Sequence, residues 1–316
     1  MNRAGVVALW LCALLPLGGK GQHVNSSRAT ARLHGPHAIS GSREASLVVV
    51  TQPEAVIFLN GVRRGTADAR GMLTLVLEPG TYTLRVSKRG REESERRLHL
   101  RPGREHRLVI PLRPLRDRAE RHRQQGDAWR EQKLFARAVA EYRRAIALRG
   151  GRFPRARLGL ARALLALEEY EEAMRQVRRA LAESHAPLPE AHTLLGNILR
   201  AQGLYEDAIR EYRAALRQAG HFSPEAHAGL ALALEEIGET EAALEHMRIA
   251  ISQNADTEPI LYYLLGNLLL SADRLQEAIA AYETYVRLDP QSETAPAVRS
   301  LIEQLRKELE GTPRDP

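Results

Sequence analysis

The sequence predicts a multidomain protein, in which a small all-β sandwich is followed by an all-α solenoid of helical hairpins. Short alternating apolar runs separated by turn residues fill residues 46–113. A pattern then recurs every 35 residues between residues 119 and 293. With 316 residues, of which 44% are hydrophobic and 27% charged, the chain is long enough for more than one core.

The net charge of +7 is unevenly distributed along the chain. Basic residues outnumber acidic ones by 5 to 1 in residues 1–45 and by 13 to 7 in residues 46–113, whereas residues 114–316 carry 28 basic and 31 acidic residues. The basic residues are nearly all Arg. We interpret the preference for Arg over Lys as a consequence of genome composition, and we expect no nucleic-acid partner.

The first 21 residues are predicted to be a secretory signal peptide. Arg3 precedes an apolar run from Val6 to Leu17, and small residues follow at a plausible cleavage site. The run is shorter than the roughly 20 residues of a spanning helix, so we expect no transmembrane span in the mature form. Retention as an anchor and lipid attachment at Cys12 remain alternatives, although Leu11 is large for a lipoprotein site.

The predicted mature protein begins near Gln22 and is periplasmic or secreted. Residues 22–45 are rich in Ser, Gly, His and Arg without periodicity, which predicts a flexible linker. Cleavage would remove Cys12, the only cysteine of the chain. Disulfides and thiol catalysis are then excluded.

Six runs in the β region are predicted as strands, with turn pairs such as Asn60-Gly61 and Pro79-Gly80 between them. The predicted strands are Leu47–Val50, Val56–Leu59, Leu73–Leu77, Tyr82–Val86, Arg96–Leu100 and Leu108–Ile110. Many short strands at close spacing predict a small sandwich.

The order of residues in this region resembles the PEGA domain. Pro53-Glu54 and Ala55 precede an apolar strand that ends in Asn60-Gly61, and Pro79-Gly80 starts a later strand. The resemblance covers about residues 46–113. It implies a module of the cell envelope, which agrees with the signal peptide.

The helical part has a fixed period. Ala138, Ala173, Ala208, Ala243 and Ala278 are 35 residues apart, and Pro154, Pro189, Pro224 and Pro259 keep the same step. Pro suits the first turn of a helix, where its missing N–H is not needed. Each unit is therefore predicted to be a helical hairpin whose alanines let neighbouring helices approach closely.

These units resemble the tetratricopeptide repeat (TPR). The family's Leu-Gly pair appears as Leu195-Gly196, and its later aromatic position holds Tyr142, Tyr212 and Tyr282. The resemblance implies five repeats over residues 119–293. One more amphipathic helix over residues 294–311 is predicted to cap the array.

No catalytic motif is present, so we expect no enzyme activity and no cofactor. His192 and His227 recur at one repeat position and could suggest a metal site. That position usually packs between the helices of a repeat, so we interpret both as packing residues and expect no metal. Most of the tyrosines are likewise interpreted as repeat core.

The TPR resemblance implies a concave groove lined by the first helix of each repeat. The predicted partner-binding residues are Arg123, Arg130, Arg155, Arg162, Asn197, Arg200, Tyr263 and Asn267. Other first-helix positions expected to be exposed are Asp127, Leu158, Thr193, Ala228, Leu232, Glu235 and Leu270. An acidic segment would lie beside the arginines, with its apolar end near Tyr263; alternatively, the arginines only solvate a helix face.

Two functions follow from these features. In the first, the protein is a non-catalytic scaffold that binds a protein or peptide partner in the groove, with the PEGA module tethering it to the envelope. In the second, it is an accessory subunit of an envelope polysaccharide or enzyme machinery, and the PEGA module contacts glycan.

Overall fold

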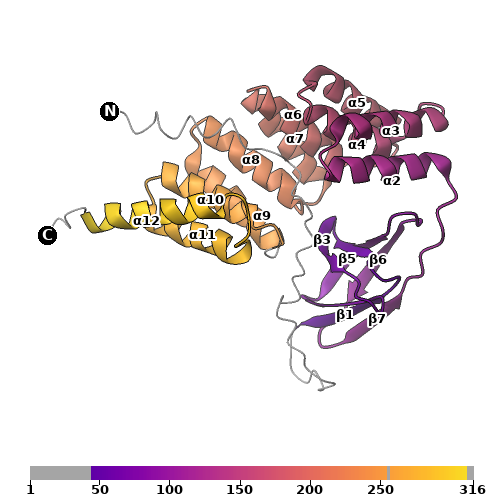
Figure 1. Ribbon diagram of the computed structural model, residues 1–316, viewed down its shortest axis with the longest axis horizontal. Helices are drawn as coiled ribbons and strands as arrows, with labels where there is room; N and C mark the ends of the chain where they lie inside the picture. The colour runs from indigo at the N-terminus through magenta and orange to yellow at the C-terminus, as the bar shows by residue number, and fades with distance from the viewer. Residues whose placement is uncertain (1–43, 255–256, 312–316) are drawn as a thin grey trace. The chain divides into compact units, whose positions relative to one another are not determined.

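The computed structural model describes residues 44–254 and 257–311 (Figure 1). They form two compact units. One consists of residues 114–185, and the other contains residues 44–113 together with the described residues from 186 onwards. The predicted order, a β-rich region followed by helical hairpins, is confirmed.

The β region contains seven strands among the described residues. They are β1 (Ala45–Val50), β2 (Val56–Leu59), β3 (Val62–Thr66), β4 (Met72–Leu77), β5 (Gly80–Ser87), β6 (Ser94–Leu100) and β7 (Glu105–Val109). The sequence prediction missed β3, because two arginines and a glycine hide its alternation. Asn60 and Gly61 have positive φ angles of 51° and 82°, as a tight two-residue hairpin turn requires, and they join β2 to β3.

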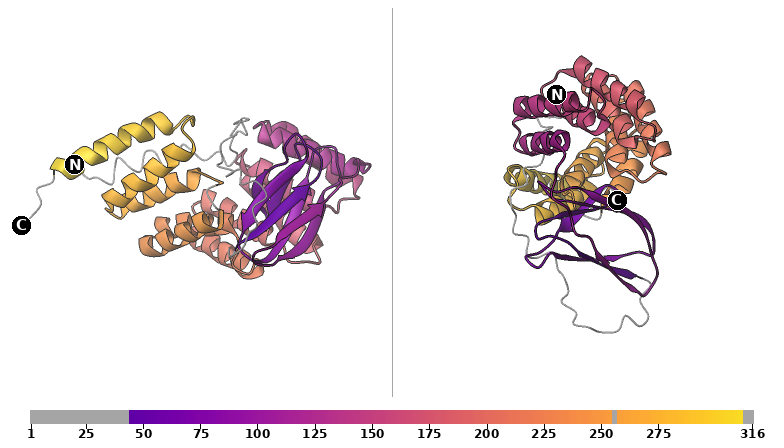
Figure 2. Two further views of the ribbon diagram at one scale, coloured as in Figure 1. Left: turned by 90° about the horizontal axis from the view of Figure 1, so that it is seen from below. Right: turned by 90° about the vertical axis from the view of Figure 1, so that its right-hand side faces the viewer.

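The strands form two sheets, which appear as separate layers in the right-hand view of Figure 2. The strand orders are β4-β1-β7 and β3-β2-β5-β6, and all pairs are antiparallel except β1 with β7. Leu47 and Val49 of β1 pack against Ile57, Leu84 and Val86, all fully buried. Alternate residues therefore face a shared core, as the sequence pattern predicts.

The helical part follows the 35-residue period. The helices are α2 (Arg118–Glu131), α3 (Phe135–Leu148), α4 (Pro154–Leu165), α5 (Tyr170–Glu183), α6 (Pro189–Ala201), α7 (Tyr205–Gln218), α8 (Pro224–Glu236), α9 (Thr240–Asn254), α10 (Ile260–Ser271), α11 (Leu275–Leu288) and α12 (Ala295–Gly311). Three of the first helices begin at a proline, and Pro259 immediately precedes α10.

Helices pack as sequential hairpins within each unit. In residues 114–185, α2 packs on α3 and α4 on α5. In the other unit, α6 pairs with α7, α8 with α9 and α10 with α11, while α12 covers α11 (Figure 1). Val298, Ile302 and Leu305 form the buried stripe of α12, and its opposite face is exposed. This helix corresponds to the predicted cap.

Candidate interaction surface

Three of the repeats are built around a buried tyrosine. Tyr142, Tyr212 and Tyr282 are completely buried and lie 70 residues apart, one in every second repeat. In repeat 3, a Cβ atom added to Gly196 would lie 2.7 Å from Cε1 of Tyr212, and one added to Gly229 would lie 2.5 Å from the same atom. The ring therefore fills space that two glycines leave open, one in its own repeat and one in the next.

The same arrangement occurs in repeat 1. Cβ atoms at Gly126 and Gly159 would lie 2.8 Å and 2.5 Å from Cε1 of Tyr142. Repeats 2 and 4 differ, because alanine replaces the first glycine and the tyrosine position holds Val177 or Met247. The array is thus periodic over 70 residues as well as over 35.

Each buried tyrosine donates its hydroxyl hydrogen to a side chain of the preceding helix. The Oη–Oδ1 distance is 2.6 Å to Asp127 from Tyr142 and 2.6 Å to Asn197 from Tyr212. Tyr282 makes the same bond to Asn267 at 2.8 Å. Burial raises the pKa of Tyr212 to about 12, while Arg200 opposes the rise and Glu225 adds to it. Two predicted partner-binding residues, Asn197 and Asn267, thus hold the repeat core.

The arginines of repeat 1 are engaged within the repeat. Arg123 is only 9% exposed and donates to Glu120 at 2.8 Å and to Asp127 at 2.6 Å. Arg130 is half-buried beside Tyr142. Burial would lower the pKa of Arg130, but Tyr142 and nearby carboxylates outweigh burial and raise it. These two guanidinium groups therefore stabilise repeat 1.

The remaining predicted residues differ in exposure. Arg155, in the first turn of α4, is exposed, and Arg162 on the same helix is half-buried. Arg200 is half-buried beside Tyr212. Tyr263 is half-buried, and its ring centroid lies 6.0 Å from that of Tyr282 and 5.6 Å from that of Tyr285.

Several first-helix positions expected to be exposed are buried. Leu158 is 1% exposed, Thr193 2%, Asn197 6% and Ala228 9%. The cause is close packing between first helices, since α2 contacts α4 and α6 contacts α8. The predicted binding role of the set stays a prediction, and within it Arg155 is the most accessible cation.

Charge separates the two helical segments sharply. Residues 114–185 carry 17 Lys and Arg against 10 Asp and Glu, whereas residues 186–316 carry 11 against 21. One pair of equivalent positions shows the contrast, with Arg155 in repeat 2 and Glu225 in repeat 4. An acidic ligand is therefore favoured by the first segment and repelled by the second.

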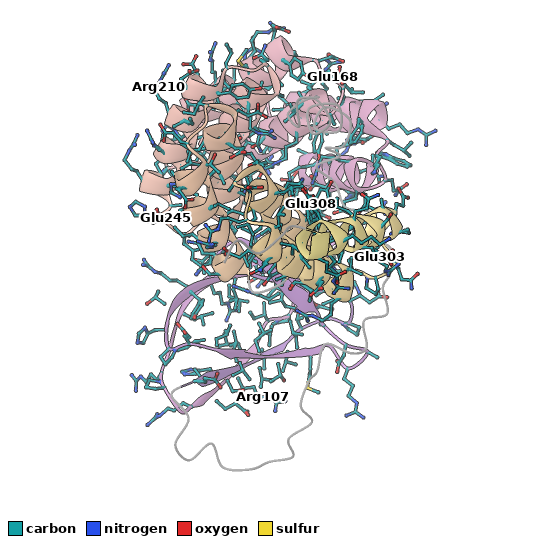
Figure 3. All side chains as sticks on the ribbon, turned by 90° about the vertical axis from the view of Figure 1, so that its left-hand side faces the viewer. Arg107, Glu168, Arg210, Glu245, Glu303 and Glu308 are labelled. Carbon is teal, nitrogen blue, oxygen red and sulfur yellow. The ribbon has the colours of Figure 1, made fainter. Side chains whose placement is uncertain are left out.

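Two hollows in the described part of the surface lie away from the predicted residues. One, of about 230 Å³, lies between α7 and the end of α8 and includes Arg213 and Ile237. Another follows the outer side of α9 near Glu245 and Arg248, and Figure 3 shows Glu245 projecting outward there. Within residues 44–254 and 257–311, no three His, Cys, Asp or Glu side chains gather as metal ligands would.

Family models for the tetratricopeptide repeat match residues 130–198, 193–259 and 260–292. Together these matches run from residue 130 to residue 292, just over half of the 316 residues. The chain belongs to the tetratricopeptide repeat family. A search of curated proteins finds no match.

A solved structure of a TPR protein shares this fold. A thermophilic TPR protein of Thermus thermophilus is 20% identical to this chain, with a TM-score of 0.52. The match covers 60% of this chain and 98% of the Thermus chain. PilF of Pseudomonas aeruginosa is 17% identical to this chain, with a TM-score of 0.48. The match covers 61% of this chain and 93% of PilF. At such identities the likeness concerns the fold alone. Among the described helices of this TPR protein, none is both long and apolar enough to cross a bilayer.

Sequence reasoning missed two features of the repeats. Gly159 and Gly229 lie seventeen residues after their tyrosines, and their 70-residue spacing was the available signal. The second missed feature is the contact between His227 and His246, whose rings lie 5.2 Å apart. The prediction that His192 and His227 pack between the two helices of a repeat fits the structure, in which each contacts the second helix.

Proposed function

We propose that this TPR protein is a non-catalytic scaffold that binds an acidic segment of a protein partner through its first two repeats. The excess of seven positive charges in residues 114–185 carries the proposal, since the later repeats are acidic. Arg155 and Arg162 on α4 supply guanidinium groups that suit carboxylates, because each can present two parallel donors.

The affinity of this surface should be modest. Exposed ion pairs contribute only about 0.2 to 1 kcal/mol each and are screened by salt. Arg123 and Arg130 contribute only indirectly to the affinity for an acidic segment, because they already bind carboxylates or Tyr142 within repeat 1. The expected apolar contact near Tyr263 stays a separate prediction.

The proposal also includes export and tethering. The signal-like residues 1–21 and the resemblance of residues 46–113 to the PEGA domain support a periplasmic or secreted protein held at the cell envelope. N-terminal sequencing of protein from native cells should give a start near Gln22. An intact Met1 on cytosolic protein would remove this part of the proposal.

The partner can be identified by crosslinking in native cells. The combined variant Arg155→Glu and Arg162→Glu should lose the crosslinked partner. Arg96→Glu with Arg97→Glu, which changes two exposed arginines of β6, is the matched control and should retain it. Loss only in the β6 variant would move binding to the β region and favour contact with an envelope component there.

A further inference from the structure

One position in the repeats joins the two helices through a polar pair. The side chain on the first helix contacts the residue nineteen positions later on the second helix. His122 Nδ1 lies 2.6 Å from Glu141, Arg157 Nη1 donates to Gln176 at 2.7 Å, and His192 Nδ1 lies 2.7 Å from Glu211. In repeat 4, the same position holds two histidines, His227 and His246.

The contacts of His227 determine which nitrogen carries each proton. His227 is 4% exposed, and its Nε2 lies 3.2 Å from the carbonyl oxygen of His221. A carbonyl only accepts, so Nε2 of His227 carries the hydrogen and its Nδ1 is an acceptor. Nδ1 of His246, 3.0 Å away, must then be the donor. In the neutral pair, only one placement of the two ring hydrogens, on Nε2 of His227 and on Nδ1 of His246, allows both hydrogen bonds.

The surroundings of the pair favour its neutral form. Burial lowers the pKa of both histidines. His246 and His221 lower the pKa of His227 further, although its bond to the His221 carbonyl opposes this. For His246, Glu245 on α9 raises the pKa and Arg213 on α7 lowers it. Among the described residues, the charged or titratable groups that shift these two pKa values lie on α7, on α8, on α9 and at His221.

We propose that the His227–His246 pair is an acid-sensitive link that holds α8 against α9 at neutral pH and releases them on acidification. A first proton on Nε2 of His246 would keep the Nδ1–Nδ1 bond but place a charge in the helix interface. A second proton would set two N–H groups and two positive charges against each other at 3.0 Å. Repeat 4 would then loosen while repeats 1 and 3 keep their His–Glu pairs.

The pH range follows from the direction of the pKa shifts. Both histidines bind protons less readily in the folded protein than in the unfolded chain, whose histidines titrate near 6.5. The stabilisation is therefore complete above about pH 6.5 and is lost progressively as the pH falls below that value.

The test compares unfolding temperatures of the full chain at pH 7.5 and pH 5.5. His246→Glu gives repeat 4 the His–Glu pair of repeats 1 and 3, and Glu211→His gives repeat 3 a second histidine pair. The wild type should lose about 2 to 4 °C more than His246→Glu on acidification, and Glu211→His should lose more than the wild type. Equal losses in all three proteins would overturn the proposal.

Imidazole ¹⁵N NMR supplies a second readout that does not depend on stability. At pH 8, the hydrogen should be on Nε2 of His227 and on Nδ1 of His246. The opposite tautomers, or a pair that titrates at the unperturbed value near 6.5, would contradict the link.

Discussion

Repeats 1 and 3 have the same core but different polar surroundings. Tyr142 and Tyr212 are both fully buried between two glycines, and each donates to the residue fifteen positions earlier. In repeat 1 that acceptor is Asp127, which also binds Arg123. In repeat 3 it is Asn197, which instead donates to a carboxylate of the next repeat at 3.3 Å.

The carboxylate that Asn197 contacts is Glu225, and its equivalent after repeat 1 is Arg155. The charge at this position is thus inverted while the tyrosine and its glycines are unchanged. In these two repeats the packing of the ring is therefore the same, although the charge at this first-helix position differs. One fold can thus carry a basic and an acidic segment.

The largest effect should come from filling the space beside the rings. Gly159→Ala and Gly229→Ala would each place a Cβ about 2.5 Å from a buried tyrosine ring, so we expect each to destabilise the protein by about 1 to 3 kcal/mol. The urea midpoint measures this. Adding Tyr212→Met, the residue type of repeat 4, to Gly229→Ala should recover part of the loss. No change in midpoint would show that the rings do not fix the repeats.

A smaller effect is expected from removing the tyrosine hydroxyls. Tyr212→Phe should cost about 1 kcal/mol, the typical net value of a neutral hydrogen bond. Tyr142→Phe should cost about 2 kcal/mol, because its acceptor Asp127 is a carboxylate. Denaturant unfolding measures the loss in free energy of unfolding for each variant. Equal losses would show that the carboxylate acceptor of repeat 1 does not make its hydrogen bond stronger than that of repeat 3.

The smallest effect on stability should come from the inverted charges. Arg155 and Glu225 are both exposed. Arg155→Glu and Glu225→Arg should therefore each change the free energy of unfolding by no more than about 0.5 kcal/mol. A loss of several times this value in thermal unfolding would show that the charges belong to the packing and cannot vary independently.

The repeats were predictable because their signals are local and periodic. The alanines at 35-residue spacing marked the second helix of every hairpin, and the prolines marked the first helix of four of the five. The buried tyrosines fell where the sequence placed them. Strand β3 was missed, because Arg63 and Arg64 dominate its short sequence and its pairing depends on the preceding turn.

The exposure of the first helices could not be predicted from the repeat pattern. Thr193 and Asn197 are polar, and their burial depends on how closely α6 approaches α8. The contact of Asn197 with Tyr212 gives that amide a partner inside the core. Such contacts between residues fifteen apart depend on the angle between helices, which a periodic pattern does not specify.

Binding of an acidic probe tests the central claim, that the basic first repeats are the interaction surface, most directly. A fluorescently labelled polyglutamate peptide can be titrated with the full chain and followed by anisotropy at low and at physiological salt. Binding should weaken with salt, and Arg155→Glu combined with Arg162→Glu should weaken it about 2- to 30-fold, the range expected for two surface ion pairs. Glu225→Arg, at the equivalent position two repeats later, should not weaken it. Equal affinities for the wild type and the double variant would contradict the account.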